Sequence, residues 1–332
     1  MSDIYRIYGA ELSPYSVKVR SYFRYKGIPH EWIVRSIDQM EEFQRYAKLP
    51  LIPLVVTPRG EGLQDSTPII ETMERRFPQP SIHPDDTALA FLSALLEEFG
   101  DEWGNKWMFH YRWARPADQD SAAERLAATM LPSADAAQKA EVAEQIKGRM
   151  VERVWFVGSN EANAPQIEAG FHEFVALLDE HLAERPYLFG GRPSFADFGL
   201  WGQLYNAWTD PTCHAIIEAD ARHLVPWIEQ MLEPRRLGEL ESWSTLGRTL
   251  SPILADHVGA LYFPWSTANA RAIAGGDEEL TVALRTGSWT QKPQKYHARS
   301  LAALKERYAA VADKSALDAI LAETGCLAWL QS

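Results

Sequence analysis

The chain has 332 residues, 46% hydrophobic and 23% charged, and a net charge of −12 from 45 acidic and 33 basic side chains. This length allows about two domains, and the acidic excess argues against binding of nucleic acid or an anionic membrane through the overall field. The two cysteines, Cys213 and Cys326, form no CxxC pair, which argues against dithiol redox chemistry and a cysteine zinc site.

The first residues show no basic region followed by an apolar run, so we expect no signal peptide. No uninterrupted apolar stretch approaches the roughly 18 residues that a membrane span needs. The sequence therefore predicts a soluble, cytoplasmic protein with no membrane partner.

The first part of the chain alternates short strands with helices. Runs rich in Ile, Tyr and Val predict the strands, and amphipathic runs predict the helices. The predicted order is strand 3–10, helix 13–27, strand 30–37, helix 38–47, strand 51–57, a turn with room for a further short strand, and helix 66–77. This alternation indicates a mixed sheet with helices packed on it.

The rest of the chain has a different pattern. Residues 77–86 contain three prolines and predict a linker. Helical periodicity then predicts a long helix over 87–113 and helices over 122–130, 136–157, 164–185, 194–208 and 223–232. Near the end, alternation around a glycine in 276–293 predicts a small hairpin, and 296–324 is helical with Gly325 as its stop.

Four short motifs, in this order, resemble the cytosolic glutathione transferases. They are Ser-Pro-aromatic in "SPYSVKVR" (13–20), the Ile-Pro dipeptide of "LIPLVV" (51–56), the acidic-Ser pair of "LQDSTPIIETMERRFP" (63–78), and Ser-x-Ala-Asp in "YLFGGRPSFADFGLWGQL" (187–204). The resemblance covers roughly residues 4–208 and is closest to serine-type, bacterial-like members.

The resemblance implies a fold and a domain plan. We expect an α/β thioredoxin-like domain over 1–80 that binds glutathione, followed by an all-α domain over 87–332. Residues 240–332 form an extension, and the resemblance implies nothing about its role. The motif Ser194-x-x-Asp197 is expected to be structural, because Ser and Asp at this spacing satisfy backbone donors at a helix start.

Ser13 is the candidate catalytic residue. Ser followed by Pro is the preferred start of a helix, so a plain cap explains it. The resemblance adds a second role: a hydroxyl at a helix N-terminus can donate to the thiolate of glutathione, and the helix dipole favours the same thiolate. Tyr8, at the end of the first strand, and Ser16, one turn further on, are the alternatives.

Ile52, Pro53, Asp65 and Ser66 are the candidate glutathione-binding residues. A cis proline at the start of a strand would leave the backbone groups of Ile52 free for a peptide, whereas an ordinary trans proline is the alternative. Asp65 and Ser66 precede a helix and could hold the ammonium and carboxylate of a γ-glutamyl group, or only cap that helix. Many family members have a lysine where this chain has Leu51; Lys48, Arg35 and Arg59 are possible substitutes.

The second substrate, a hydrophobic small-molecule electrophile, is expected between the domains. Aromatic residues at i+4 spacing in 99–111 predict either an apolar pocket or core packing. The pocket candidates are Trp103, Trp107, His110 and Tyr111. No convincing ligand set for a metal appears near His110.

The predicted function is activation of the glutathione thiol for attack on an electrophilic or conjugated small molecule, with glutathione as co-substrate. The alternative is a non-catalytic binding or assembly protein that keeps the fold. We also expect a homodimer in which the first domain of one chain packs on helix 87–113 of the other.

Overall fold

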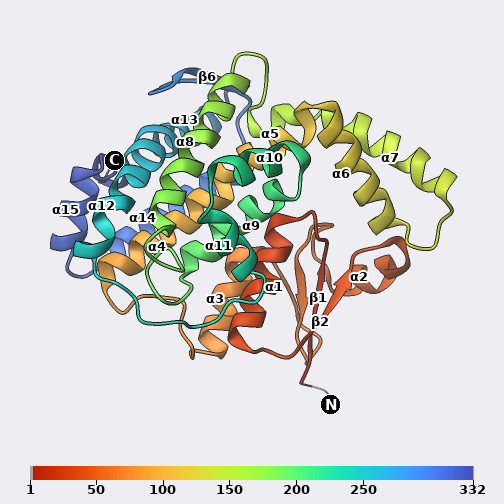
Figure 1. The fold of residues 1–332 in the computed structure, drawn as a ribbon, viewed down its shortest axis with the longest axis horizontal. Helices are drawn as coiled ribbons and strands as arrows, with labels where there is room; N and C mark the ends of the chain where they lie inside the picture. Colours follow the sequence, from red (N-terminus) through yellow and green to blue (C-terminus); the bar gives the residue numbers. More distant parts are fainter. Residues whose placement is uncertain (1–2, 332) are drawn as a thin grey trace.

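The computed structural model describes residues 3–331 and begins with a small mixed sheet covered by helices (Figure 1). Its elements are β1 (Tyr5–Gly9), α1 (Pro14–Lys26), β2 (His30–Val34), a short 3-10 turn (Ile37–Gln39), α2 (Met40–Tyr46), β3 (Leu54–Val56), β4 (Gly62–Gln64) and α3 (Ser66–Arg76). The strand order is β2-β1-β3-β4, with β1 and β2 parallel and the other pairs antiparallel. The predicted α/β class of this domain is confirmed.

Side chains of β1 alternate between the two faces of the sheet, as the strand period requires. Tyr5 and Ile7 belong to the cluster that contains residues of α1 and α3. Tyr8 belongs to a separate cluster with Phe43 of α2. The two faces of the sheet therefore have different surroundings, and α1 lies on the face opposite to Tyr8.

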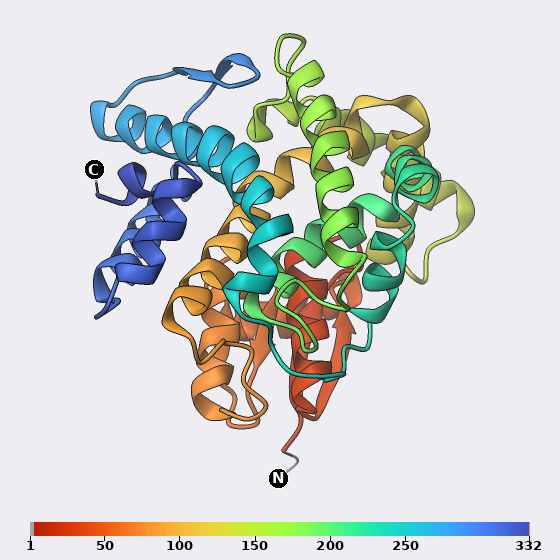
Figure 2. The same ribbon diagram turned by 60° about the vertical axis from the view of Figure 1, so that its left-hand side comes forward.

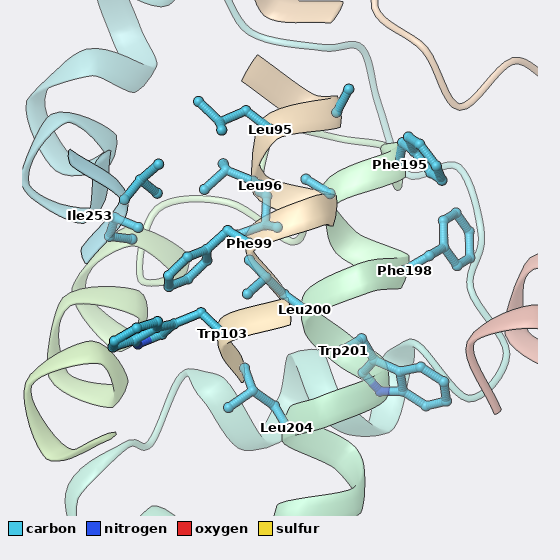
Figure 3. Packing of buried hydrophobic residues seen from close by; sticks show 14 of the residues in the cluster. Leu95, Leu96, Phe99, Trp103, Phe195, Phe198, Leu200, Trp201, Leu204 and Ile253 are labelled. Atoms are coloured by element: carbon cyan, nitrogen blue, oxygen red, sulfur yellow. The ribbon is translucent and has the colours of Figure 1, made fainter. Parts of the chain in front are cut away.

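The predicted helix over 87–113 is present but is not a regular α-helix. It consists of α4 (Thr87–Phe99), a π-helical segment η2 (Gly100–Gly104) and α5 (Asn105–Ala114). Its backbone closely approaches that of α9 (Phe195–Trp208): a Cβ on Gly199 would lie 2.7 Å from the Glu97 carbonyl oxygen, and one on Gly100 would lie 2.8 Å from the Gly199 carbonyl carbon. Figure 3 shows the large apolar side chains that fill the space around this contact.

The remaining helices of the second part enclose this pair. They are α6 (Pro116–Met130), α7 (Ala136–Val151), the 3-10 turn η3 (Val154–Val157), α8 (Ala164–Leu182), α10 (Pro211–Asp220) and α11 (Leu224–Gln230). The predicted motif at the start of α9 is a capping box, in which Asp197 Oδ2 accepts from the Ser194 backbone N–H at 2.8 Å. Its structural role is confirmed.

The extension continues the helical region and adds one hairpin. Its elements are α12 (Trp243–Ile253), the π-helical η4 (Leu254–Tyr262), α13 (Phe263–Gly275), β5 (Leu280–Leu284), β6 (Gly287–Gln291), α14 (His297–Ala310), α15 (Ser315–Glu323) and α16 (Leu327–Gln331). The predicted hairpin is confirmed, so the region is mostly rather than wholly helical. The helix predicted over 296–324 is two helices, because Asp313 accepts from the backbone and hydroxyl of Ser315 and favours a turn.

The extension packs along α4, as both ribbon views show (Figure 1, Figure 2). Phe91 of α4 meets Tyr308 of α14 with ring centroids 5.9 Å apart, and Phe99 meets Tyr262 at 6.0 Å. Together with α6, α8 and α9, which pack on other parts of the helix, the extension leaves no residue from 88 to 113 exposed. This burial within one chain leaves little of the helix for the contact with a second chain that the sequence predicted, and that contact stays a prediction.

No helix within residues 3–331 is both long enough and apolar enough to cross a membrane.

Candidate active site at the start of helix α1

Ser13 caps α1, and its two hydrogen-bond acceptor positions are both used by Ser16. The Ser13 Oγ atom accepts from the Ser16 backbone N–H at 3.3 Å and from the Ser16 hydroxyl at 2.9 Å. A serine hydroxyl has two acceptor lone pairs and one donor. The Ser13 proton is therefore the group that remains to donate, and Ser13 is half-buried at the edge of the domain.

The two alternatives to Ser13 have other positions. Ser16 is fully buried and directs its hydroxyl to Ser13. Tyr8 is also fully buried, on the opposite face of the sheet, where its ring packs against Phe43 at 6.0 Å. Burial raises the pKa of Tyr8 to about 12. Neither hydroxyl shares the half-exposed position of Ser13 at the helix start.

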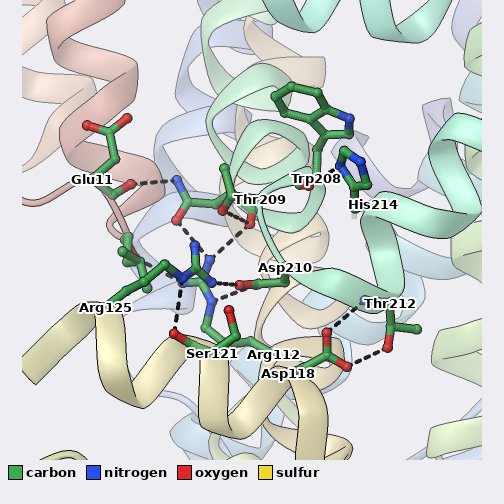
Figure 4. Close-up of polar contacts among 12 residues, drawn as sticks. Glu11, Arg112, Asp118, Ser121, Arg125, Trp208, Thr209, Asp210, Thr212 and His214 are labelled. Atoms are coloured by element: carbon green, nitrogen blue, oxygen red, sulfur yellow. Dashed lines mark hydrogen bonds and ion pairs between the residues drawn. The ribbon is translucent and has the colours of Figure 1, made fainter.

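The backbone that leads into Ser13 is held by the helical domain (Figure 4). Arg112 donates to the Leu12 carbonyl at 3.0 Å and to Asp210 Oδ2 at 2.7 Å. Asn206 donates to the Glu11 carbonyl at 3.2 Å and accepts from Arg112 at 3.0 Å. Arg112 and Asp210 are buried, so this ion pair fixes the position of the Ser13 loop relative to α5 and α9.

Sequence reasoning missed this role of Arg112. One arginine near the end of a helix is normally a solvent-exposed residue. Its buried partners come from other parts of the chain, 94 and 98 positions away, so no local pattern identifies it.

The structure brings the four candidate glutathione-binding residues to one end of the β3–β4 pair. Leu54 lies opposite Gln64 in the antiparallel register, so Ile52–Pro53 and Asp65–Ser66 follow side by side. The Ile52–Pro53 bond is cis, as predicted. Ile52 is half-buried, Pro53 is buried, and Asp65 is exposed with a left-handed φ of 75°.

Ser66 starts α3 and joins a buried polar cluster, here called the Lys18 cluster: Lys18, Ser66, Thr67, Glu97 and Asp101. Lys18 Nζ lies 2.6 Å from Asp101 Oδ2 and 3.4 Å from the Ser66 hydroxyl, and it also pairs with Glu97. Burial alone would lower the pKa of Lys18, but Asp101 and Glu97 outweigh it and raise that pKa. No local pattern in the sequence indicates this role for Lys18, Glu97 or Asp101.

Asp101 has one oxygen available within this cluster. Its Oδ2 atom faces Lys18, whereas its Oδ1 atom is buried and has no hydrogen-bond partner among the described residues. Burial raises the pKa of Asp101 to about 7, although Lys18 opposes the change. A ligand N–H group that reached Oδ1 would supply the missing partner and favour the carboxylate.

The four aromatic and histidine candidates for a substrate pocket lie in the core instead. Their exposed fractions are 5%, 2%, 2% and 1% for Trp103, Trp107, His110 and Tyr111. Trp107 packs against Phe174 with ring centroids 4.6 Å apart. The stripe therefore has the packing role that the sequence left open as the alternative, because side chains from α8 and the extension cover it.

His110 lies between Ser159, 2.8 Å from Nδ1, and Glu168, 3.1 Å from Nε2. Within residues 3–331 no group of three or more potential metal-ligating side chains is close enough to hold an ion.

Lys48, Arg35 and Arg59, the possible substitutes for the lysine expected at Leu51, do not lie together beside the candidate glutathione-binding residues. Leu51 is 61% exposed, and Lys48 and Arg59 are also exposed. Arg35 stacks on the Phe43 ring at 4.9 Å. The structure thus brings together Ser13 and Ser16, and separately Ile52–Pro53 with Asp65–Ser66.

Two family models match the chain. Residues 7–81 match the glutathione S-transferase N-terminal domain, and residues 123–230 match the glutathione S-transferase C-terminal domain. A comparison with curated proteins gave no match.

Solved structures with a similar fold include several glutathione transferases. One from Methylobacillus flagellatus, with glutathione bound, is 20% identical over 69% of this chain and 95% of its own, with a TM-score of 0.41. A β-etherase from Sphingobium is 18% identical over 68% of this chain and 94% of its own, with a TM-score of 0.45. A glutathione transferase from Phanerochaete chrysosporium is 16% identical over 72% of this chain and all of its own, with a TM-score of 0.47.

Proposed function

Because the chain belongs to the glutathione S-transferase superfamily, we propose that it activates the thiol of glutathione for attack on an electrophilic small molecule. The observation that carries the proposal is the hydroxyl of Ser13, which caps α1 and keeps its proton as a free donor. No acidic residue lies in the first turn of α1 to oppose an anion there.

The chemical step uses this donor. The thiol proton of glutathione leaves to solvent, and the Ser13 O–H group together with the N-terminus of α1 stabilises the thiolate. The sulfur then attacks the electrophilic carbon: a C–S bond forms, the bond to the leaving group breaks, and the leaving group departs with that electron pair. Ser16 orients the Ser13 hydroxyl by donating to its oxygen.

The peptide part of glutathione would lie along the end of β3 and β4. We propose that the backbone of Ile52 next to Pro53 pairs with the peptide, and that Ser66 with the N-terminus of α3 receives the γ-glutamyl carboxylate. Asp65 and the free Oδ1 of Asp101 would accept the ammonium group. Leu51 supplies no charge for the glycine carboxylate, so we expect weaker glutathione binding than a lysine there would give.

Two measurements test the function. Retention on immobilised glutathione, with elution by free glutathione, tests binding. The pH–rate profile of Ser13→Ala with a chlorodinitrobenzene tests the chemistry: the variant loses about 1 kcal/mol of stability, and its conjugation rate at neutral pH falls about 10–100-fold as the thiol pKa rises by roughly one to two units.

Asp135→Ala is the matched control, because Asp135 caps α7 with a similar bond, accepting from the Gln138 N–H at 2.9 Å. It should lose similar stability and keep the wild-type profile. A folded Ser13→Ala protein with an unchanged profile would refute the role of Ser13. A wild-type protein that neither binds glutathione nor conjugates it would favour the alternative, a non-catalytic binding protein of the same fold.

We also propose a cytoplasmic location. We further propose a homodimer; because no residue from 88 to 113 is exposed in the single chain, its interface would have to include other surfaces than the helix over 87–113. The mass in solution at micromolar concentration decides between a dimer and a monomer.

A further inference from the structure

The hairpin of the extension has two unlike edges. β5 and β6 pair in antiparallel register and lie at the periphery of the molecule (Figure 1, Figure 2). Leu284 and Gly287 flank the two-residue turn and bond to each other, so every second residue beyond them also bonds across the hairpin. The residues in between direct their backbone N–H and C=O groups outward. These outward residues are Thr281 and Ala283 in β5, and Ser288 and Thr290 in β6.

The outer edge of β6 is covered by side chains near the start of α8. The Ser288 carbonyl accepts from Gln166 Nε2 at 2.9 Å. The Thr290 carbonyl accepts from Asn163 at 2.8 Å and from Asn160 at 3.1 Å. Because these three amides occupy the outward carbonyls, no further strand can be added on the side of β6.

The outer edge of β5 is open by comparison. The outward backbone groups of Thr281 and Ala283 have no hydrogen-bond partner within residues 3–331, and both residues are exposed. The strand, LTVAL, contains neither a proline nor a charged residue, which are common means of preventing an exposed edge from pairing. A two-stranded sheet is only marginally stable by itself, so a further strand at this edge would stabilise it.

The charges that flank β5 fit a second copy of the same strand. Glu279 directly precedes β5, and Arg285 directly follows it. When two copies of β5 pair in antiparallel fashion about a two-fold axis at Val282, Thr281 lies opposite the partner's Ala283. In this register Glu279 lies opposite the partner's Arg285, and the two ends of the paired strands carry opposite charges.

Arg285 can accept a second carboxylate in addition to its contacts within the chain. Its Nη2 atom pairs with Glu173, and its Nε atom donates to the Asp256 carbonyl at 3.0 Å. A guanidinium has five N–H donors, and Nη1 has no hydrogen-bond partner among the described residues. A carboxylate of the opposite strand can therefore bind Nη1 while the contact with Glu173 persists.

We propose that the open edge of β5 pairs with β5 of a second copy, so that two hairpins form one four-stranded sheet across a two-fold axis. Four backbone hydrogen bonds, exchanged between Thr281 and the partner's Ala283 and between their two-fold equivalents, join the copies. The inference rests on the homodimer proposed above and not on the glutathione chemistry. Because a strand pair buries little area, we expect association that depends on protein concentration.

A matched pair of proline substitutions tests the edge. Ala283→Pro removes an outward N–H group in each copy, and thus two of the four intermolecular bonds, while the bonds within the hairpin remain. Sedimentation of the full-length protein from about 1 to 100 µM should show association weakened at least about tenfold. Ser288→Pro is the control, because Ser288 lies directly opposite Ala283 but faces the covered edge. It should associate as the wild type does.

A charge exchange tests the partner and the register. Arg285→Glu places like charges opposite each other and should weaken association about two- to tenfold. Adding Glu279→Arg to this variant should restore it. The pair with Glu173 is lost in both proteins, so the recovery measures the contact between the two copies.

The outcomes separate this interface from the other proposals. A monomeric wild type over the whole concentration range, an Ala283→Pro dimer as tight as the wild type, or no recovery in the charge exchange would overturn the pairing of β5. A dimer that survives Ala283→Pro would use another surface. Association that depends on Ala283 in a protein without glutathione activity would support the interface and overturn the proposed function. Thermal unfolding of each variant confirms that it is folded.

Discussion

Replacing His257 by phenylalanine should make the protein more resistant to acid. His257 lies in η4 and is fully buried among aromatic rings, with Phe174 at 5.3 Å and Trp107 at 6.1 Å between centroids. Neither ring nitrogen has a hydrogen-bond partner among the described residues; Glu173 Oε2 lies 3.7 Å from Nε2 and itself pairs with Arg285. Burial, assisted by Arg285, lowers the pKa of His257 from its ordinary value of 6.5 to about 3.

The magnitude follows from this shift. A histidine whose pKa is lowered by folding stabilises the folded state fully above its unfolded pKa, and this contribution is lost as the pH falls toward the folded value. At about pH 5 the ring is protonated in the unfolded chain but still neutral in the folded protein. The unfolding free energy is therefore about 2 kcal/mol lower at this pH than at neutral pH. Phenylalanine has no proton to bind, so His257→Phe should retain about this much more stability on acidification.

Urea unfolding of both proteins at about pH 7.5, 6 and 5 measures the difference. His181, whose pKa burial lowers to about 4, contributes equally to both proteins and cancels. The exposed His172 provides the control, since His172→Phe should leave the pH dependence of the wild type in place. Parallel stability curves for wild type and His257→Phe would show that His257 is not held neutral by burial, and would refute the reasoning.

Four further substitutions test other contacts. Arg112→Met leaves Arg125 as the remaining ion pair of Asp210 and removes the bonds to Asp210 Oδ2 and the Leu12 carbonyl, so it should lower the unfolding free energy by about 1–3 kcal/mol; no measurable loss in urea unfolding would contradict the role of Arg112 in holding the Ser13 loop. Ser16→Ala removes one hydrogen bond to Ser13, so thermal unfolding should show a loss of about 1 kcal/mol; the pH–rate profile should move in the direction of Ser13→Ala but less far, and an unmoved profile would exclude an orienting role. Gly199→Ala should cost about 1–3 kcal/mol, because its Cβ would meet backbone 2.7 Å away. Gly148→Ala, in open space within α7, should instead stabilise by about 0.5–1 kcal/mol, and equal effects of the two glycine substitutions would contradict the close helix contact.

Local signals in the sequence were sufficient for much of the first domain. Ser13 and Pro14 predicted where α1 begins, and Gly27, with a left-handed φ of 61°, ends it as predicted. Alternation around Gly287 predicted the hairpin of the extension. Such signals suffice where the conformation depends on residues within one or two turns.

Contacts between distant residues explain what the sequence could not provide. The π-helical segment η2 lies where α4 meets a glycine of α9, and no sequence pattern within 87–113 indicates that contact. In the sequence Lys18 resembles an ordinary surface lysine. In the structure it is buried and pairs with Glu97 and Asp101, which lie 79 and 83 residues later in the chain. The aromatic stripe fitted a pocket and a core equally well, because periodicity identifies a buried face but not what covers it.

The aromatic core also decides how the chain can be divided. Trp103 of η2 packs against Trp265 at 5.7 Å and Trp289 at 5.5 Å, both in the extension, and one hydrophobic cluster runs from Tyr5 to Leu330. Cutting the chain after residue 230, where the family match ends, would leave these rings of the long helix facing water. A protein cut there should therefore be less stable than the full chain, because it would lose one side of the aromatic packing around the long helix.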